Sequence, residues 1–277
     1  MQQELKLRIV SGVILAVLVL LATWYGGVAF SLLSALIGLL IYYEWSTITR
    51  LATEQPIANA IGWLGQAAIA VAVVAGTLGY SLIFLALFFL IAVGFVFVSG
   101  VSRWFPTGIV YAGLTGIALS SIRGADSVGL FAMLFVFAVV WSTDILAYFV
   151  GRAIGGPKLA PKISPGKTWS GAIGGAVSAV IAGSLVAYFA FPQSVVLAAS
   201  IAFILSVCSQ SGDLFESFIK RRFGVKDSSH LIPGHGGVMD RVDGLIFACF
   251  AAFLLAGLFS LIKGGEMTSL GAALFGV

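Results

Sequence analysis

The chain has 277 residues, of which 60% are hydrophobic and 9% are charged, and its formal net charge at pH 7 is +4. A mean hydropathy of +1.10 excludes a soluble globular domain and predicts a polytopic membrane protein. The two cysteines, Cys208 and Cys249, lie in apolar runs, so neither a disulfide framework nor a zinc site is expected. We expect the basic excess to face anionic lipid headgroups, and no nucleic acid partner.

Apolar runs of roughly 20 residues, the length that crosses a bilayer as a helix, recur along the chain. Because they are continuous rather than alternating, they predict an all-α fold with about nine transmembrane helices. The expected spans are 9–24, 28–47, 57–77, 81–99, 105–121, 127–150, 170–191, 195–217 and 243–262. We expect a single transmembrane domain, in which residues 1–125 form a lipid-facing scaffold and residues 126–263 carry the catalytic helices and loops.

The basic residues divide between the two ends of these spans. All of the 15 Lys and Arg residues except Arg123 and Lys263 fall on the side where the N-terminus lies. By the positive-inside rule the N-terminus and the large basic loops are cytoplasmic, and nine spans place the C-terminus on the opposite side. The first helix has no clear cleavage site and is expected to be retained. The sequence thus predicts a multi-pass protein of the cytoplasmic (inner) membrane.

The first five spans are expected to carry little chemistry. Glu44 and Arg103 lie near expected helix ends, where long charged side chains snorkel or contact headgroups. Small residues such as Gly171 and Gly175 in the seventh span indicate close helix packing rather than a nucleotide site.

Polarity changes in the sixth span, where Asp144 lies in an apolar run. A carboxylate at this depth must face the protein interior, and we favour a functional role over an ion pair with Arg152. The glycines and prolines of the next loop exclude a helix through its middle. Its lysines, Lys158, Lys162 and Lys167, either bind phosphate or anchor the topology. The Pro-Gly pair before Lys167 favours phosphate binding, because such a turn exposes backbone N–H groups.

The eighth helix is expected to continue into a polar stretch, residues 211–244. Four polar side chains would then share one face of this helix. They are Asp213, Glu216, Ser217 and Lys220. Asp240 and Asp243 similarly share a face where the ninth helix begins, so two helix ends direct carboxylates toward a common place.

Carboxylates in this pattern suit Mg²⁺, which takes one or two of them together with waters and substrate phosphates. The alternative is a network of ion pairs between these acids and Lys220, Arg221 and Arg241; we favour the metal. His230 and His235 either form hydrogen bonds within their loop or contact a substrate. Two histidines without cysteines do not indicate zinc.

Many defined residues of the second half form one pattern. Its C-terminal part is Ser217-x-Ile219-Lys220-Arg221, Lys226-Asp227, Ser229, Ile232-Pro233, His235-Gly236-Gly237-Val238 and Asp240-Arg241-Val242-Asp243. Its upstream part is Trp141, Asp144, Ala147, Tyr148 and Gly151, then Ser164-Pro165-Gly166-Lys167-Thr168-Trp169, then Gly212-Asp213-Leu214. The pattern resembles the phosphatidate cytidylyltransferases, also called CDP-diacylglycerol synthases, while the first half is similar only in hydropathy.

The resemblance implies a nucleotidyltransferase of phospholipid biosynthesis that acts on CTP and phosphatidate and releases CDP-diacylglycerol and pyrophosphate. It also implies a homodimer and Mg²⁺ as cofactor, and it is compatible with a second, monovalent cation such as K⁺. The implied metal ligands are Asp213, Asp240 and Asp243. The implied catalytic residues are Lys220, Arg221, Lys226, Asp227 and Asp144. The implied substrate-binding residues are Ser164, Lys167, Thr168, Ser217, His235, Gly236, Gly237 and Arg241.

Other functions remain open at this point. A CTP-dependent lipid or polyprenol kinase would use similar helices but transfer the γ-phosphate. A secondary transporter would place broken helices in both halves, whereas the polar residues here are concentrated in the second half. A CDP-alcohol phosphotransferase is disfavoured because its longer Asp/Arg/Gly pattern is absent around residues 240–244.

Overall fold

The computed structural model describes residues 2–264 and 269–277, with side chains from residue 9 onward within these ranges. Contacts divide the chain into two compact units. The first comprises Met1–Ser121 and Arg222–Arg241, and the second comprises Ile122–Arg221 and Val242–Val277. The loop 222–241 therefore packs with the N-terminal helices. The single domain expected from the sequence stays a prediction.

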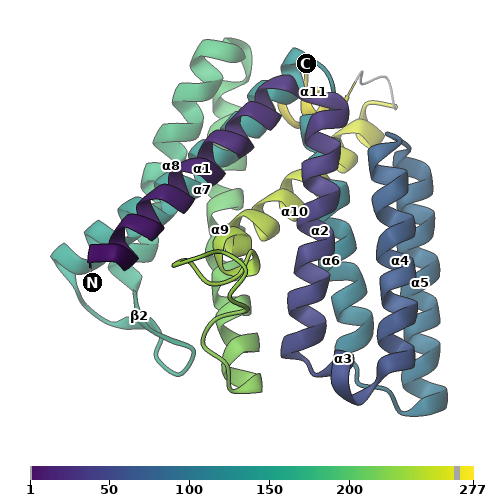
Figure 1. Ribbon diagram of the computed structural model, residues 1–277. Helices are drawn as coiled ribbons and strands as arrows, with labels where there is room; N and C mark the ends of the chain where they lie inside the picture. Colours follow the sequence, from purple (N-terminus) through teal and green to yellow (C-terminus); the bar gives the residue numbers. More distant parts are fainter. Residues whose placement is uncertain (1, 265–268) are drawn as a thin grey trace. The chain divides into compact units, whose positions relative to one another are not determined.

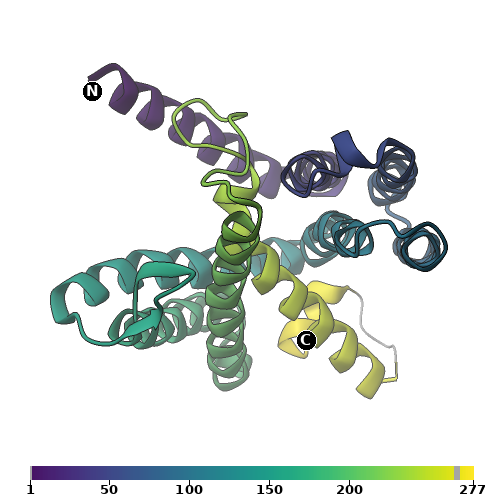
Figure 2. The same cartoon turned by 90° about the horizontal axis from the view of Figure 1, so that it is seen from below.

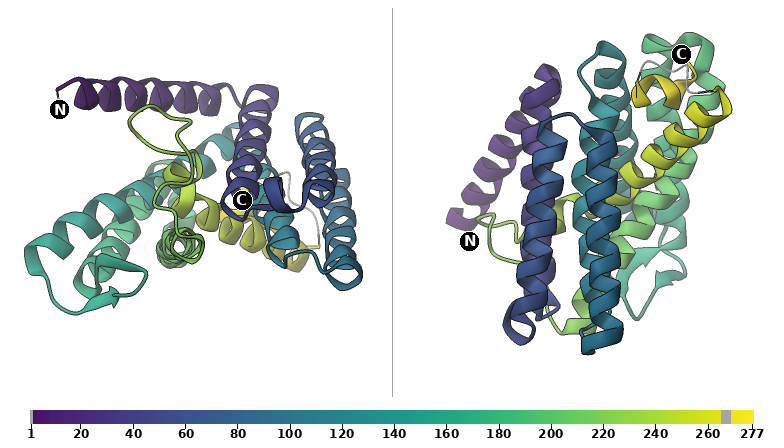
Figure 3. Two further views of the ribbon diagram at one scale, coloured as in Figure 1. Left: turned by 60° about the horizontal axis from the view of Figure 1, so that its bottom comes forward. Right: turned by 90° about the vertical axis from the view of Figure 1, so that its right-hand side faces the viewer.

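The first unit is built from helices. They are α1 (Gln2–Tyr25), α2 (Gly27–Ile48), α3 (Leu51–Glu54), α4 (Pro56–Val74), α5 (Leu78–Ser99) and α6 (Trp104–Arg123), whose last two residues belong to the second unit. In Figures 1 and 3, α4 and α5 run side by side. Pro56 starts α4 at the first helical position, where its missing N–H leaves no bond unmade.

Aromatic side chains of α2 fix this helix against α6. Tyr42 and Trp45 are fully buried, and the Trp45 indole N–H donates a hydrogen bond to the Trp104 carbonyl at 2.9 Å. Gly108 lies where a Cβ would collide with the Trp45 ring, so the two helices approach closely. This packing fixes the last turns of α2, which include Glu44.

The second unit contains the remaining elements. They are α7 (Ser127–Ile154), β1 (Lys158–Ala160), β2 (Ser164–Thr168), α8 (Trp169–Ala190), the 3₁₀ helix η1 (Pro192–Ser194), α9 (Val195–Phe223), α10 (Met239–Ile262) and α11 (Leu270–Phe275). The last residues of α9 and the first of α10 belong to the first unit. The strands between α7 and α8 form an antiparallel hairpin, with Lys158 opposite Thr168 and Ala160 opposite Ser164 (Figure 2).

Small residues hold α7 and α8 together, as the sequence predicted for Gly171 and Gly175. A Cβ on Gly171 would lie 2.6 Å from the Ala147 carbonyl oxygen, and one on Gly175 would lie 2.8 Å from that of Thr143. Any larger residue at either position would therefore push the helices apart. The close packing predicted here is confirmed.

The predicted membrane helices are confirmed as helices at every expected position. Within residues 2–264 and 269–277, eight of them are long and apolar enough to cross a membrane, and the first contains a shorter apolar segment, Ile9–Tyr25. The all-α polytopic fold is thus confirmed. The predicted absence of a helix from the middle of the loop after α7 is also confirmed, because this segment forms the β1–β2 hairpin.

Candidate active site

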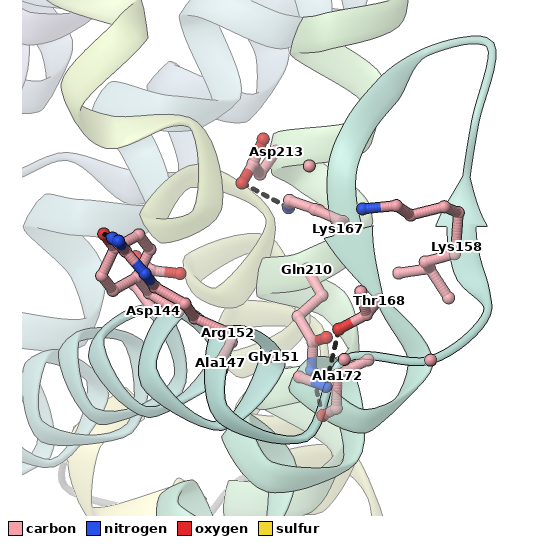
Figure 4. A pocket seen from close by; sticks show the side chains of 16 residues that line it. Asp144, Ala147, Gly151, Arg152, Lys158, Lys167, Thr168, Ala172, Gln210 and Asp213 are labelled. Atoms are coloured by element: carbon pink, nitrogen blue, oxygen red, sulfur yellow. Dashed lines mark hydrogen bonds and ion pairs between the residues drawn. The ribbon is translucent and has the colours of Figure 1, made fainter.

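The second unit contains a cavity of about 590 Å³ lined by α7, the β1–β2 hairpin, α8 and α9. Figure 4 shows how polar side chains from these elements lie around it. The charged and amide side chains are Asp144, Arg152, Lys158, Lys167, Gln210 and Asp213. The cavity is large enough for a small-molecule ligand, and its lining mixes acids with bases.

The start of α8 holds the hairpin in place at this cavity. Thr168 ends β2 and caps α8, because its Oγ1 accepts a hydrogen bond from the Gly171 N–H at 3.2 Å. The Ser170 hydroxyl donates to the Gly155 carbonyl, and the Trp169 N–H donates to the Pro157 carbonyl at 3.0 Å. These bonds tie both ends of the hairpin together, so Lys167 extends from a fixed strand.

An ion pair between Lys167 and Asp213 joins the hairpin to α9 (Figure 4). Asp144 on α7 lies within electrostatic reach of Asp213, Asp243 and Lys167, and Asp243 lies beside Glu216. Carboxylates from three helices thus converge on one lysine. Like charges this close repel one another unless a cation or a proton joins them.

The excess of carboxylates around Lys167 suits the binding of a hard divalent cation. Mg²⁺ prefers oxygen ligands, and it usually takes them from one or two carboxylates, from waters and from phosphates. In the described ranges, no three His, Cys, Asp or Glu side chains already form a metal cluster. The role of Asp213 and Asp243 as metal ligands stays a prediction, which the donor chemistry favours.

The predicted polar face of α9 is confirmed. The Ser217 hydroxyl donates to Asp213 at 3.4 Å, and Lys220 forms an ion pair with the buried Glu216 at 3.3 Å. The pair of Glu216 with Lys220 is one that the ion-pair alternative expected, whereas Asp213 pairs with Lys167, which that alternative did not include. Arg221 is exposed at the end of the second unit's part of this helix.

Arg152 does not act as the counter-ion of Asp144. Its Nη1 donates a hydrogen bond to the Tyr148 hydroxyl at 2.8 Å, and both side chains lie at the cavity. Among the described side chains, no ion pair joins Arg152 to Asp144, and a base within electrostatic reach of this carboxylate is Lys167. Asp144 faces the cavity instead, as a functional role requires.

Asp240 orders the loop that precedes α10. Its Oδ2 accepts hydrogen bonds from the Ser228 N–H at 2.8 Å, the Ser228 hydroxyl at 2.9 Å and the Gly237 N–H at 2.8 Å. The Pro233-Gly234 pair forms a tight turn in the same loop, with Gly234 at φ +77° and the His235 N–H bonded to the Ile232 carbonyl. The metal role of Asp240 stays a prediction.

Glu44 is the main correction to the sequence-based expectations. It was expected to snorkel or contact headgroups, but it is fully buried. Its two carboxylate oxygens accept hydrogen bonds from the loop before α10. The physical reason is that four donors of this loop replace water around the charge, so Glu44 does not need to reach the membrane surface. The expectation that Glu44 snorkels or contacts headgroups is therefore wrong, while the expectation that the first five spans carry little chemistry stays a prediction.

The predicted site residues are distributed over both units. The second unit holds Asp144, Ser164, Lys167, Thr168, Asp213, Ser217, Lys220, Arg221 and Asp243. The first unit holds Lys226, Asp227, His235, Gly236, Gly237, Asp240 and Arg241. Of the whole set, the cavity brings together Asp144, Lys167, Thr168 and Asp213.

Gln210 is a cavity residue that the sequence interpretation missed. Its Nε2 donates to the Ala172 carbonyl at 3.3 Å, which links α9 to α8 at the cavity, and to the Ser206 hydroxyl of α9 itself at 3.4 Å. The signal was present: an amide in an apolar helix, three residues before Asp213, shares its face.

Residues 6–259 match the profile of the Cytidylyltransferase family. The chain belongs to this family. It is 45% identical over 269 residues to a phosphatidate cytidylyltransferase of Brucella abortus (strain 2308), covering 93% of this chain and 95% of the relative. A protein of the same name from Bacillus subtilis (strain 168) is 42% identical over 154 residues, covering 54% of this chain and 56% of the relative. The family thus extends over the N-terminal helices as well as the cavity.

Proposed function

We propose that this chain is a phosphatidate cytidylyltransferase, an enzyme that transfers the cytidylyl group of CTP to phosphatidate. The observation that carries the proposal is the cavity of the second unit, where Lys167 meets converging carboxylates in a member of the Cytidylyltransferase family. A nucleoside triphosphate site requires acidic side chains that bind a cation and basic side chains that bind the phosphates.

In the proposed reaction, a phosphate oxygen of phosphatidate attacks the α-phosphorus of CTP. A new P–O bond forms, the bond between the α-phosphorus and the bridging oxygen breaks, and pyrophosphate leaves with that electron pair. The products are CDP-diacylglycerol and pyrophosphate. Negative charge grows on the leaving group, so fixed cations near it lower the barrier.

The chain supplies these cations from the hairpin and α7. Lys167 pairs with Asp213 and can exchange this partner for a phosphate, while Lys158 and Arg152 line the same cavity. Asp213 and Asp243, with Asp144, would hold Mg²⁺, which when bound neutralises phosphate charge. A second cation such as K⁺ is compatible with this number of acids.

The exposed face of α7 suits a lipid acceptor. Trp141, Ile145 and Phe149 flank Asp144 along this helix, and each is exposed. Acyl chains can cover such apolar side chains while the phosphate of the same lipid enters the charged cavity. This arrangement favours an acceptor that arrives from the bilayer, as phosphatidate does.

Labelled CTP tests the proposal against its alternatives. With CTP labelled at the γ-phosphate, the purified protein should release labelled pyrophosphate and leave the lipid unlabelled. A kinase would instead label the lipid and release CDP, which would refute the proposed reaction. No movement of label with any lipid acceptor would favour a transporter.

We further propose a homodimer in the cytoplasmic (inner) membrane, with the N-terminus and the basic loops in the cytoplasm and the C-terminus opposite. Cysteines replacing Lys158 and Lys226 should react with an impermeant thiol reagent only in inside-out vesicles, and one replacing Ala125 only in right-side-out vesicles. The positive-inside distribution of Lys and Arg supports this orientation, and the family resemblance supports the homodimer. Labelling of all three positions in one vesicle type would contradict the proposed topology.

A further inference from the structure

We infer that Glu44 positions the loop Ser228–Met239 for cytidylyl transfer by binding the backbone where α10 begins. The inference rests on the proposed function, and it gives the N-terminal helices a part in the reaction. Figures 2 and 3 show this loop, in light green, beside the helices of the first unit.

Each oxygen of the Glu44 carboxylate accepts two hydrogen bonds from the loop. Oε1 accepts from the Ser229 hydroxyl at 2.6 Å and the Val238 N–H at 2.7 Å. Oε2 accepts from the Ser228 hydroxyl at 3.1 Å and the Met239 N–H at 2.6 Å. One side chain thus fixes both ends of a segment of twelve residues in a definite geometry.

The electrostatic setting explains why a carboxylate is stable at this buried position. The N–H groups at the start of a helix have no partners within the helix and carry partial positive charge. Val238 and Met239 supply two of these groups at the start of α10. Glu44 satisfies them with a full negative charge, and the hydroxyls complete its shell, so the charge is compensated without a cation.

The space around Glu44 is shaped for this contact. A Cβ on Gly237 would collide with the Glu44 carboxylate and the Ser228 hydroxyl, so glycine is required there. Neighbouring Asp240 binds the Ser228 and Gly237 N–H groups. The carboxylates of Glu44 and Asp240 therefore bind different N–H groups of the same loop, and both accept a hydrogen bond from the Ser228 hydroxyl.

The loop also contacts α1 in the first unit. The Ser11 hydroxyl lies 2.9 Å from Nδ1 of His235 and donates to the Pro233 carbonyl at 3.1 Å. Lys226 and Asp227 belong to the pattern that resembles the family, and they directly precede the segment that Glu44 holds. His235, from the same pattern, lies within this segment. A change in its conformation would therefore displace residues that the family resemblance assigns to the reaction.

Replacing Glu44 by glutamine gives a sharp test because the two side chains have the same shape. Two backbone N–H groups, which cannot reverse their direction, need one acceptor oxygen each. In either orientation of the glutamine amide, its NH₂ group faces one of them, donor against donor. Glu44→Gln is thus expected to release part of the loop without leaving a cavity.

The full chain is purified with Cys208 and Cys249 replaced by alanine, and a spin label is attached to a cysteine at Leu231 in the loop. A reference label is placed at Ile57 on α4; both positions are exposed. In Glu44→Gln, the Leu231 label should become more mobile while the Ile57 label does not change. We expect kcat to fall by about tenfold or more, the typical effect of losing a supporting contact.

The matched control is Glu54→Gln, the same change at an exposed residue of the first unit, where the carboxylate forms an i, i+4 ion pair with Arg50 at 3.7 Å. It should alter neither kcat nor either label. Wild-type turnover and unchanged Leu231 mobility in Glu44→Gln would overturn the inference. Increased mobility at both labels would also overturn it, because Glu44 would then support the whole unit.

If Glu44→Gln does not fold, the single change Ser228→Ala removes one hydroxyl donor to Glu44 and keeps both backbone contacts. It leaves the Leu231 N–H bonded to the Ser229 hydroxyl, and Asp240 loses the Ser228 hydroxyl but keeps the Ser228 N–H. It should mobilise the Leu231 label and lower kcat, and a loop as ordered and active as wild type would overturn the inference. Absence of cytidylyl transfer by the unaltered chain would refute the proposed function alone, because label mobility reports the Glu44 contact separately.

Discussion

Asp243→Asn and Asp213→Asn are each expected to lower turnover by about a hundredfold or more, the effect of removing one transition-state charge contact. Asparagine keeps the shape of the side chain and removes the charge that a hard cation requires. Both residues belong to the carboxylate group of the second unit. The measurement is the initial rate of cytidylyl-lipid formation as a function of Mg²⁺ concentration.

A second measurement separates binding of the cation from activity. A ligand that binds only the folded protein raises its apparent stability. Mg²⁺ with CTP should therefore raise the thermal unfolding midpoint of the unaltered protein and have a smaller effect on either variant. Near-normal activity and Mg²⁺ dependence in both variants would place the metal site elsewhere.

Asp240→Asn is the informative comparison. An asparagine carbonyl can still accept the three hydrogen bonds that Oδ2 of Asp240 receives from the loop. We expect the same loss of activity as at Asp243, because the family resemblance implies that Asp240 is a metal ligand. Full activity with asparagine would assign Asp240 to loop ordering alone.

The helices could be predicted because their signal is local. A run of apolar residues must form a helix to satisfy its backbone in lipid, and each predicted span coincides with a helix in the structure. The spacing of Asp213, Ser217 and Lys220 likewise fixes their common face, since side chains three or four residues apart meet on any α-helix. These predictions needed no knowledge of what the helices pack against.

Glu44 could not be placed correctly, because its partners lie far away in the sequence. Its contact with Ser229 joins residues 185 positions apart. A glutamate near the end of a span has the same local sequence whether it faces headgroups or an inserted loop. One general clue was available: a charge within an apolar span is costly unless it is compensated. The same reasoning identifies Asp144 and applies equally to Glu44.

Which lysines line the cavity could not be predicted from the sequence either. The sequence grouped Lys158, Lys162 and Lys167 as one basic loop, but the hairpin separates them. Lys158 and Lys167 line the cavity from paired strands, whereas Lys162 is exposed in the turn. Strand pairing decides which side chains face inward, and the register of so short a hairpin cannot be predicted from composition.

This separation gives the last prediction, a comparison of Lys167→Ala with Lys162→Ala. Lys167 extends from β2 into the cavity and forms the ion pair with Asp213. If it binds a phosphate of CTP, its removal should lower kcat/KM for CTP by about a hundredfold, as for other lost charge contacts to a reacting phosphate. Lys162→Ala should have a normal kcat/KM.

The same pair of variants separates phosphate binding from membrane topology, the alternative role of these lysines. Both substitutions remove one positive charge from the same loop, so an effect on insertion would appear equally in both. Lys167→Arg keeps the charge but replaces a compact ammonium by a wider, planar group, and it should recover only part of the activity. Equal kcat/KM values for Lys167→Ala and Lys162→Ala would show that position in the hairpin does not matter, and Lys167 would then serve the topology alone.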